Sequence, residues 1–301
     1  MSEIKASPSV RARANAAGID LDARARALGR TTLGHEDLAA EGPSDAAAPA
    51  APAPVASDAT RYWDVDHAQY GPVTHEPMSR IAQAAARNLA AAQALIPAVT
   101  HHDHARTDRI EALRTAWKDE GRARGVKLTA LAFHVVALSR CLRDFPRFNA
   151  SLTPDGETLV LKNYVHVGIA VDTAYGLIVP VIREADRKGL WAIAAEIADL
   201  AGRAQARKIR PDEMGGASMT ISNLGGIGGA GFTPIVNPPE VAILGLTRTE
   251  TATEWIDGGP APVARVPLDL SYDHRVINGA DAARFLRTYA GYLEEPRRLL
   301  I

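Results

Sequence analysis

The 301-residue sequence has few of the features that place a protein in an oxidising compartment or a membrane. Its one cysteine, Cys141, excludes an intramolecular disulfide framework and fits a reducing compartment. No apolar run approaches the roughly 20 residues of a membrane span, and residues 1–9 lack the basic start and apolar core of a secretion signal. A formal net charge of −1 gives no general attraction to nucleic acid or anionic membranes. We therefore expect a soluble, cytoplasmic protein that binds neither.

Composition divides the chain into three parts. Residues 42–60 are mostly Ala and Pro, without large apolar side chains to pack, and predict an extended linker. Before the linker, residues 1–41 carry the pattern of a small helical module. After it, residues 61–301 are long enough for one sizeable domain.

The large domain alternates helical and strand-like patterns. Helices are expected at 79–95, 106–122, 129–143, 189–206 and 280–293, and strands at 96–105, 158–172, 176–184, 217–222, 240–247 and 262–273. This alternation predicts an α/β two-layer sandwich, in which helices cover one face of a mixed sheet. Cys141 falls within an apolar helical pattern, which favours a small buried hydrophobe over a nucleophile.

A cluster of histidines at 101–104 raises the question of a metal site. Adjacent residues on a strand point to opposite faces, so His101 and His102 would not converge on one ion. No Cys or His pair at ligand spacing supports the cluster from elsewhere in the sequence. We therefore predict no metal site.

His274 is the strongest candidate for chemistry. It stands at the end of the strand-like run 262–273 and before the turn that leads into the helix at 280–293. The backbone at a strand end is rigid and can hold a side chain in a fixed position, and the unperturbed pKa of histidine suits proton exchange near neutral pH. A histidine at a strand end is nevertheless more often structural, so position alone does not decide its role.

A second candidate is Ser222, at the end of a short strand that runs into a cluster of glycines at 225–229. Glycines let the backbone approach a ligand closely. The alternative is a mobile surface loop, and the glycine spacing fits neither a dinucleotide-binding nor a P-loop motif.

The run Ser271-Tyr272-Asp273-His274-Arg275-Val276-Ile277-Asn278-Gly279 resembles the Asp-His-Arg-x-x-Asp-Gly signature of the dihydrolipoyl acyltransferases of 2-oxo acid dehydrogenase complexes. A His-x-x-x-Asp-Gly element also occurs in the related chloramphenicol acetyltransferases. Asn278 departs from the usual Asp. The resemblance extends from about Pro77 to Ile301 and includes 145–149 and 164–168. It implies a chloramphenicol acetyltransferase-like fold. It also implies transfer of an acyl group, an acetyl group in the first place, between a dihydrolipoyl thiol and coenzyme A.

The resemblance also implies roles for individual residues. His274 would be the general base, and the Ser222 hydroxyl would donate to the oxyanion of the tetrahedral intermediate. Arg275 and Asn278 would hold the turn that carries the histidine. Arg114 would meet the phosphates of coenzyme A, and Asp172 would accept a hydrogen bond from its adenosine or pantetheine part. Arg114 in a solvated helix and Asp172 at a strand end also have purely structural explanations.

Partners follow from the same resemblance. The family builds its site between the protomers of a homotrimer, and an apolar end such as 299–301 docks trimers into a cubic or dodecahedral core. Residues 5–41 resemble the peripheral subunit-binding domain, but the central loop at 25–33 is altered. The module is therefore either a degenerate remnant or a working dock for a 2-oxo acid decarboxylase or dihydrolipoyl dehydrogenase. No lipoyl-domain pattern precedes it. Either the lipoyl group arrives on another polypeptide, or this chain is the tail of a longer or split gene product.

Two other functions remain open at this point. The chain could be a non-catalytic scaffold that assembles with a complete acyltransferase, although a scaffold would need neither His274 nor Ser222. It could also be a free-standing acetyltransferase for a small molecule, which would require a pocket closed to a lipoyl arm.

Overall fold

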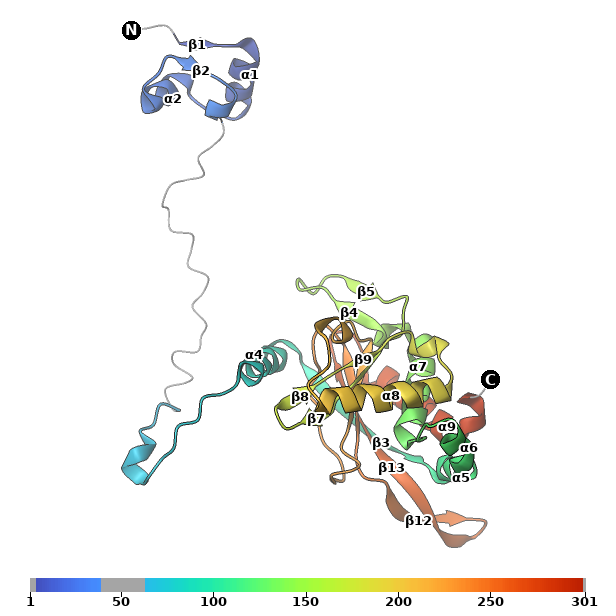
Figure 1. The fold of residues 1–301 in the computed structure, drawn as a ribbon. Coiled ribbons are helices and arrows are strands. Elements are labelled where there is room, and N and C mark those ends of the chain that lie inside the picture. The colour runs from blue at the N-terminus through green and yellow to red at the C-terminus, as the bar shows by residue number, and fades with distance from the viewer. Residues whose placement is uncertain (1–3, 39–62, 300–301) are drawn as a thin grey trace. The chain divides into compact units, whose positions relative to one another are not determined.

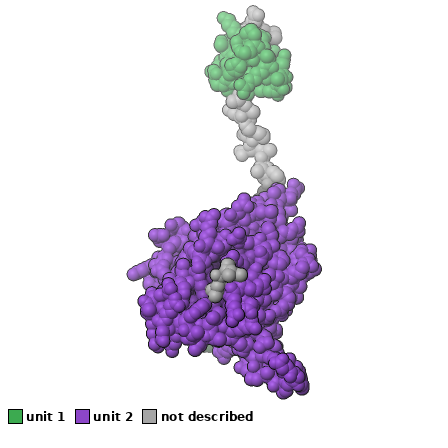
Figure 2. Space-filling view, turned by 90° about the vertical axis from the view of Figure 1, so that its right-hand side faces the viewer, with its two compact units in different colours: residues 1–76 green, residues 77–301 purple. Residues whose placement is uncertain are grey.

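The computed structural model describes residues 4–38 and 63–299, and the chain divides into two compact units, 1–76 and 77–301 (Figure 2). The predicted linker at 42–60 lies outside the described residues. No helix in the described ranges is both long and apolar enough to cross a membrane.

The N-terminal unit contains a small two-helix module. Helices α1 (Pro8–Ala16) and α2 (Leu21–Leu28) begin at the capping residues Ser7 and Asp20, whose side chains accept backbone hydrogen bonds in the first turn of each helix. Strands β1 (Lys5–Ala6) and β2 (Thr32–Leu33) pair in parallel, and a 3₁₀ turn, η1 (Glu36–Leu38), follows. Buried Asp37 accepts hydrogen bonds from Arg30 and from the Gly34 N–H. Another 3₁₀ turn, η2, spans His67–Tyr70.

A seven-stranded mixed sheet forms one layer of the second unit (Figure 1). Its strands are β3 (Ala98–Arg106), β6 (Val167–Ile169), β9 (Val181–Ile182), β10 (Met219–Asn223), β11 (Ala242–Leu246), β12 (Glu250–Ile256) and β13 (Gly259–Asp273). Strand β10 runs parallel to both β6 and β11, whereas β13 pairs antiparallel with β11 and β12 along one edge and with β3 along the other. Two hairpins, β4 (Ala150–Leu152) with β5 (Leu159–Leu161) and β7 (Val171–Thr173) with β8 (Gly176–Ile178), lie outside this sheet.

Helices form the other layer (Figure 1). They are α5 (Asp108–Ala116), α6 (Lys118–Ala123), α7 (Ala130–Asp144), α8 (Leu190–Gln205) and α9 (Gly279–Glu294), and α7 packs against both α8 and α9. The buried side chains of α5, α7, α8 and α9 share one apolar core with Leu268, Leu270 and Tyr272 of β13. Helix α4 (Arg80–Leu95) differs, because Ala92 is its one buried residue. The predicted α/β two-layer sandwich is confirmed.

The sheet face away from this core is polar. Because side chains alternate along a strand, Asp269, Ser271 and Asp273 lie opposite the apolar residues of β13, yet each is at most 2% exposed. The Ser271 hydroxyl pairs with that of Thr100 at 2.7 Å, across β3 and β13. This second face therefore holds buried polar groups that need hydrogen-bond partners, and it is the face that carries Ser222.

Some helices and strands predicted from local sequence patterns were wrong where the chain leaves the sheet. The strand expected at 158–172 is three short strands, β5, β6 and β7, and the helix expected at 106–122 breaks at Trp117 into α5 and α6. Strands β4 and β12 were not expected. Cys141 is fully buried, as predicted, and burial raises the pKa of its thiol well above the usual range.

Candidate active site

His274 sits in a tight turn directly after β13. The N–H groups of Val276 and Ile277 both donate to the Asp273 carbonyl at 3.0 Å, and the His274 N–H donates to the Pro97 carbonyl at 3.1 Å. The imidazole is exposed, with its ring centroid 5.8 Å from that of Tyr272. The backbone is thus fixed on both sides of an accessible ring, as a group that exchanges protons requires.

An ion pair braces the same turn. The Arg275 guanidinium donates to both carboxylate oxygens of Asp273, with the shortest contact 2.6 Å, and the Arg275 N–H donates to the same carboxylate at 3.0 Å. Asp273 is 2% exposed, so this pairing satisfies a buried charge. The hydrogen bonds that the Arg275 guanidinium donates to Asp273 raise the pKa of Arg275. Arg275 therefore holds the turn, as predicted from the sequence.

Asn278 supports the turn from the other side, as the N-cap of α9. Its Oδ1 atom accepts a hydrogen bond from the Asp281 N–H at 2.9 Å. Asn and Asp serve equally well at this position, since both offer an oxygen to the free N–H groups of the first turn. The departure from the family signature thus leaves the start of the helix intact.

Ser222 lies on β10, half-buried, and among the described residues its hydroxyl has no hydrogen-bond partner. The chain turns directly after it, because the Asn223 side chain accepts from the Gly225 N–H at 2.9 Å. The hydroxyl is therefore free to donate to a ligand.

Next to Ser222, a buried acid joins β10 to the start of β11. The Thr220 hydroxyl donates to Glu240 Oε1 at 2.9 Å, and burial raises the pKa of Glu240 to about 7. Sequence reasoning missed this contact, since no local pattern marks Glu240.

One chain does not bring His274 and Ser222 together. In the sheet register, Ser222 lies opposite Gly245 and Gly245 opposite Asp269, whereas His274 is five positions beyond Asp269 along β13. Two strand spacings of about 4.8 Å and five residues of about 3.3 Å put the two α-carbons about 15–20 Å apart. A site that uses both residues needs two chains.

The Phe232 ring lies over the strand beside Ser222. A β-carbon on Gly245 would come within 2.8 Å of two ring carbons of Phe232, so the ring packs directly on the backbone of β11. Ser222 and Gly245 are cross-strand neighbours, which puts an aromatic wall next to the serine. No local sequence pattern marks Phe232 for such a position.

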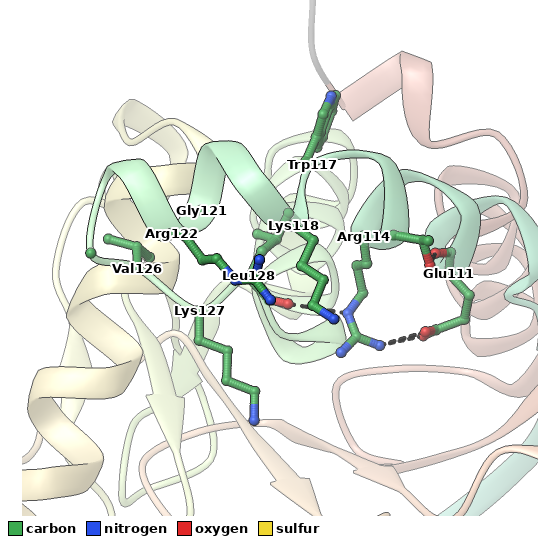
Figure 3. Close-up of a pocket in the computed structure, with 11 residues that line it drawn as sticks. Glu111, Arg114, Trp117, Lys118, Gly121, Arg122, Val126, Lys127 and Leu128 are labelled. Atoms are coloured by element: carbon green, nitrogen blue, oxygen red, sulfur yellow. Dashed lines mark hydrogen bonds and ion pairs between the residues drawn. The ribbon is translucent and has the colours of Figure 1, made fainter.

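Arg114 lines a cavity of about 540 Å³ between α5, α6 and the loop that follows (Figure 3). Its guanidinium donates to the Leu128 carbonyl at 3.1 Å and to the Glu111 carboxylate at 2.6 Å. Three further cationic side chains line the cavity: Lys118, Arg122 and Lys127. With Glu111 as the one acidic residue of the lining, the cavity favours an anionic ligand.

Asp172 lies elsewhere, exposed on hairpin strand β7, and does not line this cavity. Its backbone carbonyl accepts a hydrogen bond from the Gln205 amide at 2.6 Å, which ties the hairpin to the end of α8.

The histidines at 101–104 have separate neighbours. His102 Nδ1 bonds to Asp269 Oδ1 at 2.6 Å on one face of β3, and Asp103 pairs with Arg287 at 2.8 Å on the other. Among the described residues, no group of three or more His, Cys, Asp or Glu side chains is placed to hold a metal ion.

Residues 70–301 match the family described as 2-oxoacid dehydrogenases acyltransferase (catalytic domain). The chain belongs to this family. Among curated relatives, this acyltransferase-family chain is 48% identical over 238 residues to the dihydrolipoyllysine-residue acetyltransferase component of the pyruvate dehydrogenase complex of Pseudomonas aeruginosa, covering 79% of this chain and 44% of that protein. It is 47% identical to the corresponding component of Azotobacter vinelandii, covering 79% of this chain and 37% of that protein. The chain thus spans less than half the length of these relatives.

Two solved structures agree with this assignment. One was used to investigate a serine, a histidine and an asparagine in the catalytic mechanism of Azotobacter vinelandii dihydrolipoamide acetyltransferase, with a TM-score of 0.77, 46% identity, and coverage of 79% of this chain and 98% of that one. The other is the cubic core of a pyruvate dehydrogenase multienzyme complex, with a TM-score of 0.77, 47% identity and the same coverage.

Proposed function

We propose that this chain transfers acetyl groups between coenzyme A and a dihydrolipoyl thiol, as the core subunit of a 2-oxo acid dehydrogenase complex of the pyruvate type. One observation carries the proposal. The serine, histidine and asparagine studied in the Azotobacter vinelandii enzyme are 52 and 4 residues apart in sequence, and Ser222, His274 and Asn278 have the same spacing. In this chain the imidazole of His274 is exposed, the hydroxyl of Ser222 has no partner among the described residues, and Asn278 caps a helix.

The chemistry follows from those positions. His274 takes the proton from the thiol of coenzyme A as its sulfur attacks the acetyl-lipoyl thioester, since a free thiol with a pKa of about 8.5 is mostly protonated at neutral pH. Ser222 donates to the oxyanion of the tetrahedral intermediate. When the intermediate collapses, the C–S bond to the lipoyl sulfur breaks and His274 returns the proton to that sulfur. No covalent acyl-enzyme forms.

The site is completed by a second copy of the chain. The sheet register keeps Ser222 away from the His274 of its own chain, so each site takes the serine from one protomer and the histidine from another. Exposed apolar side chains on α4, among them Ile81, Leu89 and Leu95 at 42–67% exposure, offer a surface for such association. A homotrimer, further assembled as in the cubic core of its structural relative, is the assembly we propose.

The preference for acetyl has a structural basis in Phe232. Its ring occupies the space over Gly245, directly beside Ser222. When Ser222 binds the oxyanion, the ring therefore leaves little room for a long or branched acyl chain. A two-carbon acyl group fits beside that wall.

Coenzyme A would place its phosphates in the cationic cavity at Arg114, where guanidinium and ammonium groups suit phosphate oxygens. Asp172 would accept a hydrogen bond from the adenosine or pantetheine part, and its exposed carboxylate is available for that role.

Delivery of the substrate completes the proposal. A lipoyl domain would bring the acyl group, and the N-terminal module would dock the decarboxylase or the dihydrolipoyl dehydrogenase. We place the assembly in the cytoplasm.

The test is acetyl transfer from acetyl coenzyme A to dihydrolipoamide, with His274→Ala compared with the wild type. We expect loss of nearly all activity, since general base catalysis contributes about 10²–10⁴-fold. His104→Ala, which removes another exposed histidine, should have no effect. An assembled wild-type protein no more active than His274→Ala would contradict the proposal and favour a scaffold.

A further inference from the structure

Four residues from four adjacent strands form a row on the polar face of the sheet. His102 of β3 lies opposite Asp269 of β13, Asp269 opposite Gly245 of β11, and Gly245 opposite Ser222 of β10. Directly paired residues share a face, so Ser222 and His102 point the same way, three strand spacings of about 4.8 Å apart. That distance is too long for a direct contact between them.

Asp269 is the centre of this row. Although it is 2% exposed, both its carboxylate oxygens are satisfied: His102 Nδ1 donates to Oδ1 at 2.6 Å, and the Phe232 N–H donates to Oδ2 at 3.0 Å. A buried carboxylate needs such partners. The His102 side chain is 56% exposed and lies over the acid from the solvent side.

The hydrogen bond from the Phe232 N–H to Asp269 connects His102 and Asp269 to the aromatic ring beside Ser222. Asp269 fixes the backbone of Phe232, and the ring of the same residue packs on Gly245. Gly245 also lacks the side chain that would push the ring away, and the β-carbon of Asp269 lies 3.2 Å from where a Gly245 β-carbon would be. The position of the wall is therefore set from one side by the glycine and from the other by the acid.

We propose that His102 and Asp269 form a positioning pair that holds Phe232 over Gly245 and so sets the size of the acyl group accepted beside Ser222. The inference rests on the proposed function. His102 neither touches the acyl group nor moves a proton in the reaction; it orients Asp269, and Asp269 holds the loop. Without the imidazole, Asp269 Oδ1 would be left without its partner, and the acid could turn from the Phe232 N–H.

The test compares kcat/KM for acetyl and butyryl coenzyme A, with dihydrolipoamide as acceptor, in wild type, His102→Leu, His102→Asn, Asp269→Ala and His104→Leu. His102→Asn places an amide N–H near the position of Nδ1 and should keep selectivity close to wild type. His104→Leu is the matched control, because His104 is an exposed histidine on the same face of β3 whose cross-strand neighbour is Pro267. Hydrogen exchange of the 224–239 backbone is measured on the same proteins.

We expect His102→Leu and Asp269→Ala to lower the preference for acetyl over butyryl by about tenfold, the lower end of the effect of one methylene in an apolar pocket, and to speed exchange at 224–239. His104→Leu should change neither quantity. An unchanged preference in folded His102→Leu and Asp269→Ala would overturn the proposal, even if exchange is faster. A wild-type protein without acetyl transfer would instead overturn the proposed function, and unchanged exchange in the variants would then also overturn the role of the pair in holding Phe232.

Discussion

His274 is held by its backbone, which leaves its ring free. Among the described residues, neither ring nitrogen has a hydrogen-bond partner, while the turn is fixed by Asp273 and Arg275. A base that must take up and return one proton in each cycle benefits from this arrangement, since a permanent partner on the reacting nitrogen would compete with the substrate thiol.

In the proposed mechanism, Ser222 is the hydrogen-bond donor that complements this base. Its hydroxyl meets nothing in the described part of its own chain, so its hydrogen bond would form when the oxyanion develops. Interactions that are stronger in the transition state than in the ground state raise kcat and leave substrate binding nearly unchanged.

Ser222→Ala should therefore lower kcat for acetyl transfer by about 10²–10³-fold, with little change in the KM of acetyl coenzyme A. Steady-state kinetics with dihydrolipoamide measure both quantities. Ser151→Ala is a suitable control, because Ser151 is a half-buried strand serine on the β4–β5 hairpin, outside the main sheet. A loss expressed mainly in KM would show that Ser222 binds the ground state instead.

At the scale of elements, α9 connects the active-site turn to the core. Its first turn is capped by Asn278, and farther along Tyr289 meets His134 of α7, with 2.5 Å between the hydroxyl and Nδ1. Both side chains are buried, and burial lowers the pKa of His134 to about 4. This histidine is therefore neutral in the folded protein at neutral pH.

Stability should consequently fall as the pH drops from about 6.5 to 4. In that window the unfolded chain binds a proton at His134 and the folded chain does not, so acid favours unfolding by up to about 3 kcal/mol. Urea unfolding at a series of pH values measures the slope. In the double variant His134→Phe/Tyr289→Phe this contribution should disappear, and an identical slope in variant and wild type would contradict the assignment.

Elements with a strong period were predictable, and long-range contacts were not. The helices expected at 189–206 and 280–293 are observed at Leu190–Gln205 and Gly279–Glu294. The strand expected at 158–172 continues to alternate in sequence, yet Asn149 donates to the carbonyl groups of both Lys162 and Tyr164 and draws the chain out of the sheet. No local pattern in 158–172 contains that contact.

In the candidate site too, the sequence predicts local positions but not long-range contacts. His274 and Ser222 stand out in the sequence because each is expected near the end of a strand and before a turn, and the structure has Ser222 near the end of β10 and His274 directly after β13. Their separation, and the contact between His102 and Asp269, depend on strand register between residues up to 167 positions apart. The alternation of side chains along β3 and β13 predicts which residues of each strand share a face. It does not predict that His102 and Asp269 are neighbours, because that depends on the register between the two strands.

At the scale of the whole molecule, the proposed site needs two copies of the second unit, one to supply His274 and one to supply Ser222. Strand β13 delivers His274 at one end of the sheet and β10 delivers Ser222 toward the other, because the two strands run in opposite directions on either side of β11. A symmetric assembly resolves this separation, since each copy then offers its histidine to one neighbour and its serine to another. The proposed activity therefore depends on association of the chains.

Complementation between two inactive variants tests this account most directly. His274→Ala and Ser222→Ala chains, each with little acetyl transfer alone, are unfolded, mixed in equal amounts and refolded together. Random assembly gives an intact histidine opposite an intact serine at about one interface in four, so the mixture should recover about a quarter of wild-type activity. Each variant refolded alone serves as the control. A mixture no more active than the mean of its two components would contradict a site shared between chains.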